Sequence, residues 1–263
     1  VNGETESVLT GGSASITAKD AGKYANTATG TDKNYDLTFV DGSLDIAKAQ
    51  ATITANSLNT TYNGKYQTAT GFIASGLVNG ETESVLTGVS ASVTAKDVGK
   101  YVNTATGTDK NYDLTFVDGS LDIAKAQAII TANSLNTVYN GKDQTATGFT
   151  AKGLVNGETE SVLSNVSASV TGKDAGTYSN TATGTDSNYD LSFVDGSLNI
   201  TKAKINQVNG ITANNRVYDA TTNATLNTSS AQFDGIMLGD ELVVGNATGK
   251  FSDKNAANGK QVS

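Results

Sequence analysis

The sequence contains no cysteine, histidine, tryptophan or proline, and aromatic residues make up 6% of its 263 residues. Without cysteine, the chain can form neither a disulfide scaffold nor a thiolate metal site. Without histidine, its many serine hydroxyls have no imidazole to act as a general base. No run of 18 apolar residues and no charged-then-apolar leader is found, so we expect no membrane insertion by this segment and no export signal within it.

Basic residues are also few relative to acidic ones. The chain has 18 Lys and Arg against 26 Asp and Glu, which gives a formal net charge of -8. Binding to nucleic acid requires a basic surface that neutralises phosphates. The charge therefore predicts a soluble surface and no nucleic-acid partner.

One sequence of 77 residues recurs along the chain, beginning at Val1, Val78 and Val155. Residues 1–77 and 78–154 differ at only nine aligned positions, several of which exchange one apolar residue for another. A catalytic centre needs one geometry held once, whereas near-identical neighbours suit a role that depends on number, reach or multivalency. The repeat therefore predicts a spacer or adhesive stalk and not an enzyme.

The repeat divides the chain into a partial repeat (1–49), two complete repeats (50–126 and 127–203) and a C-terminal partial module (204–263). The first residue lies within a repeat, and no closing turn or strand pattern precedes the last. We therefore expect the segment to be a window of a longer chain.

Local patterns within one repeat predict strands. Small apolar and polar residues alternate at 51–55 and 89–95, as in half-buried strands. The segment 81–86 can hold a short helical turn. No amphipathic helix of normal length is found, so we expect an all-β unit of six or seven strands.

Two turn signals predict hairpins. Asn63-Gly64 supplies positive φ at low cost between two strand patterns. Asp118-Gly119 separates the alternating segments 112–117 and 120–123, and is the clearer of the two.

The pattern Asp-x-Gly-x-Tyr ends at Tyr24, Tyr101 and Tyr178. In immunoglobulin-like sandwiches, a tyrosine after such a turn forms a tyrosine corner, in which the phenol bonds to upstream backbone. Asn103 stands where an antibody domain has its second cysteine. The pattern therefore predicts the sandwich architecture without a true immunoglobulin domain.

The repeats follow one another through segments such as 46–51 and 123–128, which contain neither glycine nor proline. Short links between strands restrict the swing of neighbouring modules. The predicted fold class is all-β, with tandem small immunoglobulin-like β-sandwich modules forming an elongated rod.

An Asp-x-Asn-Tyr-Asp segment spaces oxygen atoms as at the start of a calcium loop. The glycine and glutamate that complete an EF-hand loop are replaced by Leu37 and Ser43. The sequence thus favours a solvated loop between strands, with calcium as the alternative and no other cofactor expected. The candidate ligands are Asp32, Asn34, Asp36, Asp109, Asn111, Asp113, Asp186, Asn188 and Asp190.

Other chemistry-bearing patterns favour structural interpretations. The carboxylates of Glu4/Glu6, Glu81/Glu83 and Glu158/Glu160 are spaced like a glycosidase dyad, but three equal copies argue against catalysis. One Thr-Ala-Thr triplet per repeat is too few for an ice-binding face. Isopeptide crosslinks among Lys, Asn and Asp remain an alternative without a defining signature.

The units beginning at Gln50 and Gln127 resemble MBG modules, the mostly-β, glycine-rich repeats of large bacterial surface proteins. The resemblance covers residues 1 to about 203. It rests on Ile53-Thr54-Ala55, Tyr62-Asn63-Gly64, the segment 76–81, Asp97-x-Gly99-x-Tyr101, Asn111-Tyr112 and Phe116-x-x-Gly119-x-Leu121-x-Ile123. The tail resembles a YDG-type module through Tyr218-Asp219-x-Thr221-Thr222, although Ala220 stands where that family has glycine.

Both modules resemble the distal repeats of filamentous-haemagglutinin-type adhesins, which Gram-negative bacteria export by two-partner secretion. This resemblance implies an extracellular segment, on the cell surface or in the secreted matrix, that links binding regions for attachment and biofilm cohesion. It implies no catalytic residues. Expected partners are matrix polysaccharide, host or bacterial surface glycans, and other copies of the chain through exposed strand edges. A multivalent carbohydrate-binding module is the alternative, although no tryptophan is available for an aromatic platform.

Overall fold

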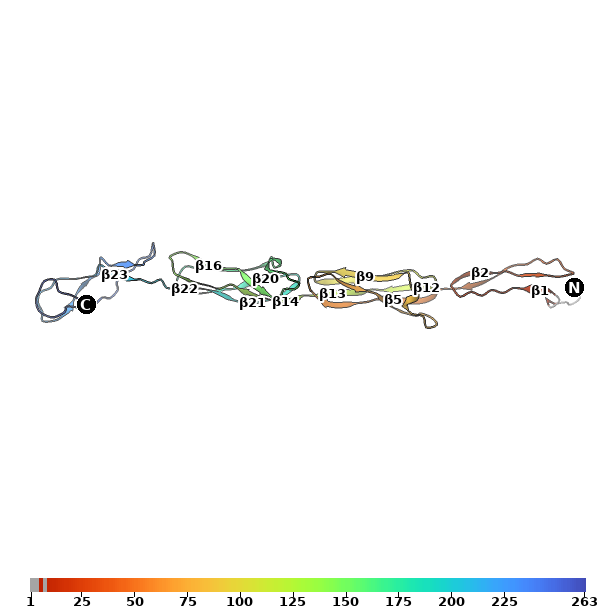
Figure 1. Cartoon of the computed structure of the whole chain (residues 1–263), viewed down its shortest axis with the longest axis horizontal. Coiled ribbons are helices and arrows are strands. Elements are labelled where there is room, and N and C mark those ends of the chain that lie inside the picture. Colours follow the sequence, from red (N-terminus) through yellow and green to blue (C-terminus); the bar gives the residue numbers. More distant parts are fainter. Residues whose placement is uncertain (1–4, 7–8) are drawn as a thin grey trace. The chain divides into compact units, whose positions relative to one another are not determined.

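The computed structural model describes residues 5–6 and 9–263, so the prediction for Glu4 lies outside the described residues. The described part of the chain is built from short strands together with the 3-10 turns η2 and η3 (Figure 1). It separates into two compact units. The first comprises residues 1–126 together with 155–158 and 187–189, and the second comprises 127–154, 159–186 and 190–263. Tandem all-β modules, as predicted, are confirmed.

The strands fall into four groups along the sequence. The partial first repeat contains β1 (Thr10–Ser13), β2 (Gly22–Asn26), β3 (Thr29–Thr31) and β4 (Gly42–Ile46). The second repeat contains β5 (Ala49–Ala55), β6 (Leu58–Thr61), β7 (Gln67–Thr70), β8 (Phe72–Ser75), η2 (Glu83–Val85), β9 (Val89–Ala95), β10 (Gly99–Asn103), β11 (Ala105–Gly107), β12 (Tyr112–Val117) and β13 (Gly119–Ala124).

The third repeat contains β14 (Ala126–Ala132), β15 (Leu135–Val138), β16 (Gln144–Thr147), β17 (Phe149–Lys152), η3 (Glu160–Val162), β18 (Val166–Gly172), β19 (Gly176–Asn180), β20 (Ala182–Gly184), β21 (Tyr189–Val194) and β22 (Gly196–Thr201). The C-terminal module contains β23 (Gln207–Asn209), β24 (Thr212–Ala213), β25 (Asn223–Ala224), β26 (Leu226–Asn227), β27 (Gln232–Asp234) and β28 (Gly249–Lys250). Each complete repeat thus has nine short strands, not the six or seven predicted, because bends divide the longer strands.

The second repeat forms three small sheets, with strand orders β12-β5-β8, β10-β13-β6 and β11-β9-β7. The pairings β12–β5 and β13–β6 are parallel, and the others are antiparallel. These parallel pairings depart from a purely antiparallel sandwich. The predicted helical turn at 81–86 is confirmed by η2.

Both predicted hairpins are wrong. The strands β12 and β13 flank Asp118 but belong to different sheets, and β6 and β7 flank Asn63-Gly64 but pair with β13 and β9. The physical reason is that β12 and β13 each pair in parallel with another strand, β12 with β5 and β13 with β6. The chain passes from one sheet to the other between β5 and β6, from Ala55 to Leu58, just as it does between β12 and β13. A turn signal marks the bend in the chain but does not choose the partner of each strand.

Asn103 stabilises the bend at which the chain passes from β5 to β6. Its side chain is fully buried, and Nδ2 donates a 2.8 Å hydrogen bond to the carbonyl oxygen of Asn56. Asn180 makes the same 2.8 Å bond to Asn133 in the third repeat. The asparagine amide therefore stabilises the bend by a hydrogen bond, and it stands at the position where an antibody domain has a disulfide-bonded cysteine.

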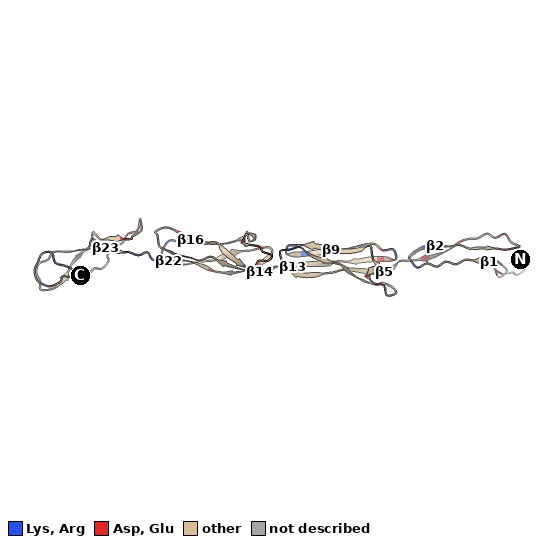
Figure 2. Cartoon of the chain, in the orientation of Figure 1, with Lys and Arg blue, Asp and Glu red and all other residues tan. Residues whose placement is uncertain are grey.

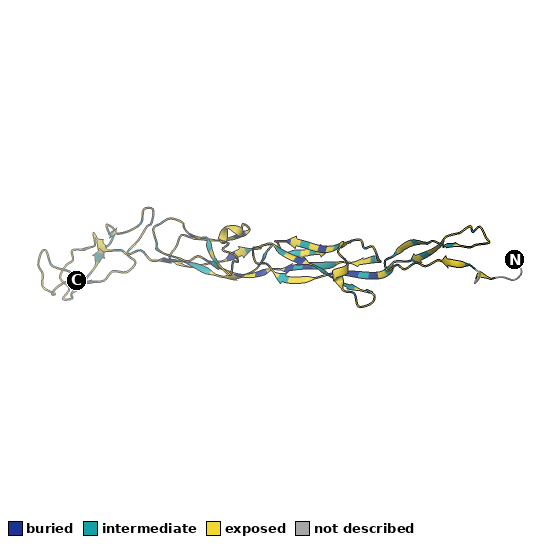
Figure 3. Cartoon of the chain, turned by 45° about the vertical axis from the view of Figure 1, so that its right-hand side comes forward, coloured by how far each residue is buried: buried dark blue, intermediate teal, exposed yellow. Residues whose placement is uncertain are grey.

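The core lies within the complete repeats (Figure 3). The buried apolar residues run from Ala51 to Ile200, and none of the described residues outside that range joins them. Alanine is the commonest of them, so each cluster buries modest apolar area around a few larger side chains such as Ile53 and Leu121. The tyrosine corners are confirmed: Tyr101 Oη donates to the carbonyl oxygen of Asp97 at 3.0 Å. Tyr24 and Tyr178 do the same.

No helix among the described residues is long and apolar enough to cross a membrane.

Candidate functional site at the joints between repeats

A tyrosine of the second repeat docks on a carboxylate of the third. Tyr62 follows β6 and is 5% exposed, and its Oη donates a 2.6 Å hydrogen bond to Glu158 Oε1. Tyr189 Oη donates to the other oxygen of the same carboxylate at 2.5 Å. The two rings meet edge to face, with centroids 5.4 Å apart. These residues all belong to the first unit, so one carboxylate bridges two tyrosines within a compact body.

This environment disfavours ionisation of the Tyr62 phenol. Burial, followed by the hydrogen bond to Glu158, raises the pKa of Tyr62 well above its usual range. The neighbouring turn adds a further bond, from Asn156 Nδ2 to the carbonyl oxygen of Gly64 at 3.1 Å. The Tyr62 loop is therefore held through both side chain and backbone.

An asparagine forms the second part of the joint. Asn188 Oδ1 accepts a 2.9 Å hydrogen bond from the backbone N–H of Val98, and Nδ2 donates to Asp97 Oδ1 at 3.2 Å. Both contacts are to the tyrosine-corner loop of the second repeat. Asn188 thus forms a direct hydrogen bond with the backbone of the preceding repeat.

The first and second repeats meet in the same way. Asn111 Oδ1 accepts the backbone N–H of Ala21 at 2.8 Å, and Nδ2 donates to Asp20 Oδ1 at 3.2 Å. Here an ion pair is added, with Lys110 Nζ 2.6 Å from Asp20 Oδ2. The hydrogen bonds from Lys110 and Asn111 lower the pKa of Asp20. Ser187 stands at the position of Lys110 in the third repeat, so this ion pair has no counterpart there.

The C-terminal module receives the corresponding tyrosine of the third repeat. Tyr139 Oη donates a 2.8 Å hydrogen bond to Asp240 Oδ1, and this bond raises the pKa of Tyr139. Met237 lies against Gly141, whose added Cβ would be 3.2 Å from Met237 Cβ. A cavity of about 310 Å³ within the second unit is lined by Tyr139, Ala175, Met237 and Asp240, among others.

Two of the nine calcium candidates lie in these joints, and several others bond within their own repeat. The side chains of Asp32 and Asp109 cap their own loops, since Asp109 Oδ1 accepts the backbone N–H groups of Asn111 and Tyr112 at 2.7 and 3.0 Å. Asn111 and Asn188 contact the preceding repeat, as described above. Asp113 and Asp190 accept hydrogen bonds from Gln50 and Gln127. Within residues 5–6 and 9–263, no three His, Cys, Asp or Glu side chains form a metal-binding group. Calcium binding stays a prediction.

The paired glutamates have separate structural partners. Glu81 Oε2 accepts a 2.6 Å bond from Tyr112, whereas Glu83 Oε1 accepts the backbone N–H of Ala74 at 3.1 Å, which lowers the pKa of Glu83. Glu160 repeats the arrangement with Ala151 at 3.0 Å. The first glutamate of each of these two pairs thus accepts hydrogen bonds from tyrosine hydroxyls. The second accepts a hydrogen bond from a backbone N–H group.

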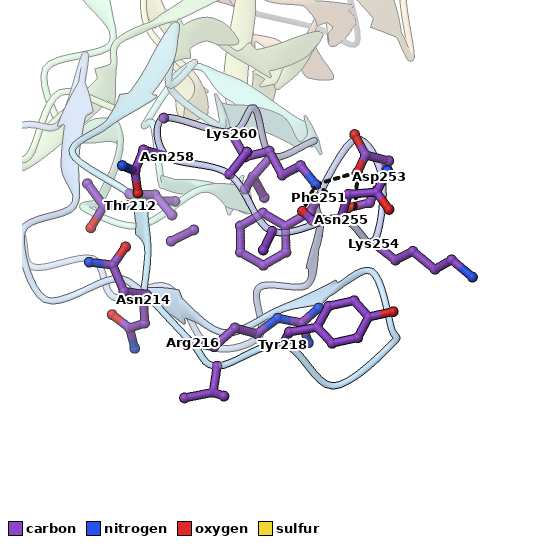
Figure 4. A pocket seen from close by; sticks show the side chains of 18 residues that line it. Thr212, Asn214, Arg216, Tyr218, Phe251, Asp253, Lys254, Asn255, Asn258 and Lys260 are labelled. Carbon is purple, nitrogen blue, oxygen red and sulfur yellow. Dashed lines mark hydrogen bonds and ion pairs between the residues drawn. The ribbon is translucent and has the colours of Figure 1, made fainter.

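The C-terminal module also has an open cavity of about 930 Å³ (Figure 4). Arg216 lies at its edge, hydrogen-bonded to Asp219 Oδ2 at 2.8 Å, with its guanidinium 5.1 Å from the ring centre of Phe251. Lys260 pairs with Asp253 on the opposite loop. The backbone N–H of Thr221 is the main cause of a lowered pKa at Asp219. Away from this cavity, acidic and basic residues are interspersed along the chain (Figure 2).

Comparison with protein families accounts for the repeat. The model of the MBG domain (YGX type) matches residues 1–45, 51–122 and 128–199. The chain belongs to the MBG domain family. A YDG domain matches residues 201–263, so the predicted order of MBG repeats followed by a YDG module is confirmed. The link to haemagglutinin-type adhesins and two-partner secretion stays a prediction.

No curated protein matches this chain. Three chains of solved structures match. One is the crystal structure of Down Syndrome Cell Adhesion Molecule (DSCAM) isoform 1.30.30, N-terminal eight Ig domains, at 11% identity and a TM-score of 0.20. The match covers 84% of this chain and 37% of that chain, so the present chain corresponds to little more than a third of it.

Sequence reasoning did not find the joint residues of the MBG repeats. The sequence places Tyr62 only in the MBG-like turn Tyr62-Asn63-Gly64, Glu158 only in a carboxylate pair, and Asn188 in a candidate calcium loop. The available signal was that all three recur at fixed places in every repeat. The hydrogen bond between Tyr62 and Glu158 could not be predicted from the sequence, because the two residues lie 96 residues apart in the chain.

Proposed function

We propose that this segment is a repetitive stalk of a large secreted or cell-surface bacterial adhesin, which projects or links binding regions for attachment and biofilm cohesion. The MBG and YDG domain types already indicate a repetitive extracellular, adhesin-like protein. The finer role, the Gram-negative host and export by two-partner secretion belong to the proposal. So does the absence of catalysis.

The observation that carries this proposal is the repeated joint. The second repeat offers the third a tyrosine and a backbone N–H, and receives a carboxylate and an asparagine in return. The N–H and asparagine contact recurs between the first and second repeats, and the tyrosine and carboxylate contact recurs between the third repeat and the YDG module. Such bonds resist free swivelling of neighbours, since a rotation large enough to separate them leaves a buried polar group without a partner. A stalk that transmits force or keeps its tip at a distance requires this property.

Small-angle X-ray scattering on the whole chain tests the proposal, first with calcium and then with a chelator. We expect an elongated particle whose maximum dimension does not change when calcium is removed. A compact particle would contradict the stalk. Extension that depends on calcium would instead support metal binding at the loops that begin at Asp32, Asp109 and Asp186.

Carbohydrate binding is the second candidate, and the cavity of the YDG module favours it. Its rim carries amide side chains such as Asn214 and Asn258, together with Tyr218 (Figure 4). Amides and aromatic rings are common ligands for sugar hydroxyls and sugar faces. The cavity occurs in the YDG module, so one site per chain is expected, not the multivalent array of the sequence-based alternative. Titration with matrix polysaccharides, with Asn214→Ala as the variant and Tyr66→Ala as a surface control, measures this.

A further inference from the structure

The YDG module repeats the loop that carries the joint tyrosine. Tyr218 lies in Val-Tyr-Asp-Ala, where the third repeat has Val-Tyr-Asn-Gly around Tyr139. The backbone N–H of Thr221 bonds Asp219 Oδ1 at 2.9 Å, just as that of Lys142 bonds Asn140 Oδ1 at 3.0 Å. Both loops therefore close with the same side-chain turn.

The following residue confirms that the two loops share a backbone. Ala220 has φ of 63°, close to the 72° and 75° of Gly64 and Gly141. Alanine is strained in this left-handed region, where its Cβ approaches the following carbonyl oxygen, whereas glycine is not. A strained residue that retains the glycine conformation indicates that the loop shape is required here.

The surface that meets such a tyrosine is also a repeated structure. It is a turn in which the backbone N–H of an acidic residue bonds a carbonyl three positions earlier: Glu81 to Val78 and Glu158 to Val155 at 3.0 Å, and Asp240 to Met237 at 3.1 Å. A glycine with positive φ precedes the acid in each case. This Gly-acid turn is shared by the MBG repeats and the YDG module, so docking does not depend on the type of module.

The surroundings of Tyr218 differ from those of Tyr62 in one respect. Tyr218 is 58% exposed, whereas Tyr62 is 5% exposed beneath the Gly-acid turn. Beside Tyr218, the loop that follows β28 lines the same cavity, at the topological place of the tyrosine-corner loops that follow β9 and β18. Among the charged lining residues, Arg216 pairs with Asp219 and Lys260 pairs with Asp253, and Lys254 adds one further positive charge, which suits an acidic partner.

We propose that Tyr218 and the loop 252–261 form a docking surface for the Gly-acid turn of another MBG- or YDG-type module. In the docked state Tyr218 Oη donates a hydrogen bond to the carboxylate of that turn, and an asparagine of the incoming module meets the loop 252–261. The inference goes beyond the stalk proposal, because it rests on joint geometry and holds whether or not the chain serves adhesion.

A second copy of the chain is the probe, because residue Asn34 stands at the position of Asn111 and Asn188. Asn34 and Asn111 also share their loop bond, from each backbone N–H to the aspartate two residues earlier. The chain has no cysteine, so two introduced thiols report on one contact alone. One copy carries Asn258→Cys in the loop 252–261, and the other carries Asn34→Cys.

We expect the mixed copies to form a disulfide-linked dimer at least ~5-fold faster than a control mixture in which the second copy carries Tyr66→Cys, since docking raises the effective concentration of the paired thiols. Tyr66 is 77% exposed and lies outside the joint. Adding Tyr218→Phe to the first copy removes one hydrogen bond and should lower the rate roughly 5-fold. The intramolecular pair Val98→Cys with Asn188→Cys serves as the positive control for joint geometry.

Equal rates for the Asn34→Cys and Tyr66→Cys mixtures would overturn the proposal. A rate that Tyr218→Phe leaves unchanged would also overturn it, because the tyrosine would not then contribute to docking. Binding of a uronic-acid polysaccharide that Tyr218→Phe weakens, without cross-linking above the control, would assign the surface to glycan instead. None of these results bears on the scattering test of the stalk.

Discussion

The joints formed by Tyr62 and Tyr139 place the same side chain in two different settings. Tyr62 meets a glutamate that also binds Tyr189, its ring meets that second ring edge to face, and Asn156 bonds its loop. Tyr139 meets the shorter Asp240 and is only half-buried. Where Asn156 stands in the MBG repeat, the YDG module has the fully exposed Leu238.

This difference distinguishes the contacts that both joints share from the contacts that are found where two MBG repeats meet. The tyrosine, the acid and the turn that carries it are common to both settings. The second tyrosine and the asparagine bond occur where one MBG repeat follows another. The junction with the YDG module is therefore the weaker joint, with fewer bonds and more exposed surface.

Removing the Tyr62 hydroxyl should give the largest effect. Tyr62→Phe leaves the part-buried carboxylate of Glu158 without one of its donors, which costs about 1–3 kcal/mol of unfolding free energy. Tyr139→Phe should cost less, because Tyr139 is half-buried whereas Tyr62 is buried. Urea unfolding of both variants measures the difference, and Tyr66→Phe is the matched control. A larger loss at Tyr139 would reverse the ranking of the two joints.

Exchanging glutamate and aspartate at Glu158 and Asp240 compares the same two joints. Glu158→Asp shortens the side chain that bridges two tyrosines, so one of the two bonds is lost at a cost of roughly 1 kcal/mol. Asp240→Glu should change stability little, since Tyr139 is the carboxylate's single tyrosine partner. Thermal unfolding checks both variants. Equal losses would show that the bridge to Tyr189 adds nothing.

Alkaline pH should open the joints. The pKa of Tyr62 is raised in the folded state, so its contribution is fully present below the unfolded value of about 10 and is lost as pH rises through the folded value. Tyrosinate absorbance and circular dichroism followed together should show the last phenols ionising as the structure is lost. Titration of all tyrosines near pH 10 with no loss of structure would contradict it.

Acid pH should act on the second glutamate of each pair. Glu83 and Glu160 have lowered pKa values because backbone N–H groups bond them, so their contribution is present above the unfolded pKa and is lost as pH falls through the folded value. Glu83→Gln should make stability less sensitive to acid. Lys33→Gln, in an exposed loop, is the control, and an unchanged acid midpoint would remove Glu83 from the explanation.

The ion pair of Lys110 with Asp20 should give the smallest effect. Lys110→Ser makes the joint between the first and second repeats like the next one, which has Ser187. Both side chains are largely exposed, so we expect a small loss at low salt that disappears at high salt. A loss that persists in high salt would mean that the pair is more important than its exposure implies.

Much of the fold could be predicted from local pattern. The alternating strands, the helical turn at Glu83 and the three tyrosine corners follow from short-range chemistry, because periodicity and turn residues act over a few positions. The hairpins could not be predicted in this way. Strands β12 and β13 adjoin in sequence, yet each is paired by a partner 63 residues away, from Ala49 to Tyr112 and from Leu58 to Leu121.

The sequence by itself determined the tandem MBG and YDG order and the all-β class, because a recurring pattern of strands and turns carries that information locally. Tertiary structure alone decided which carboxylate meets which tyrosine. It also showed that Asn111 and Asn188, which the sequence offers as calcium candidates, contact the preceding repeat. The physical reason is that a side-chain hydrogen bond between repeats depends on where folding brings two loops, and residues 90 or more apart leave no local trace of that proximity.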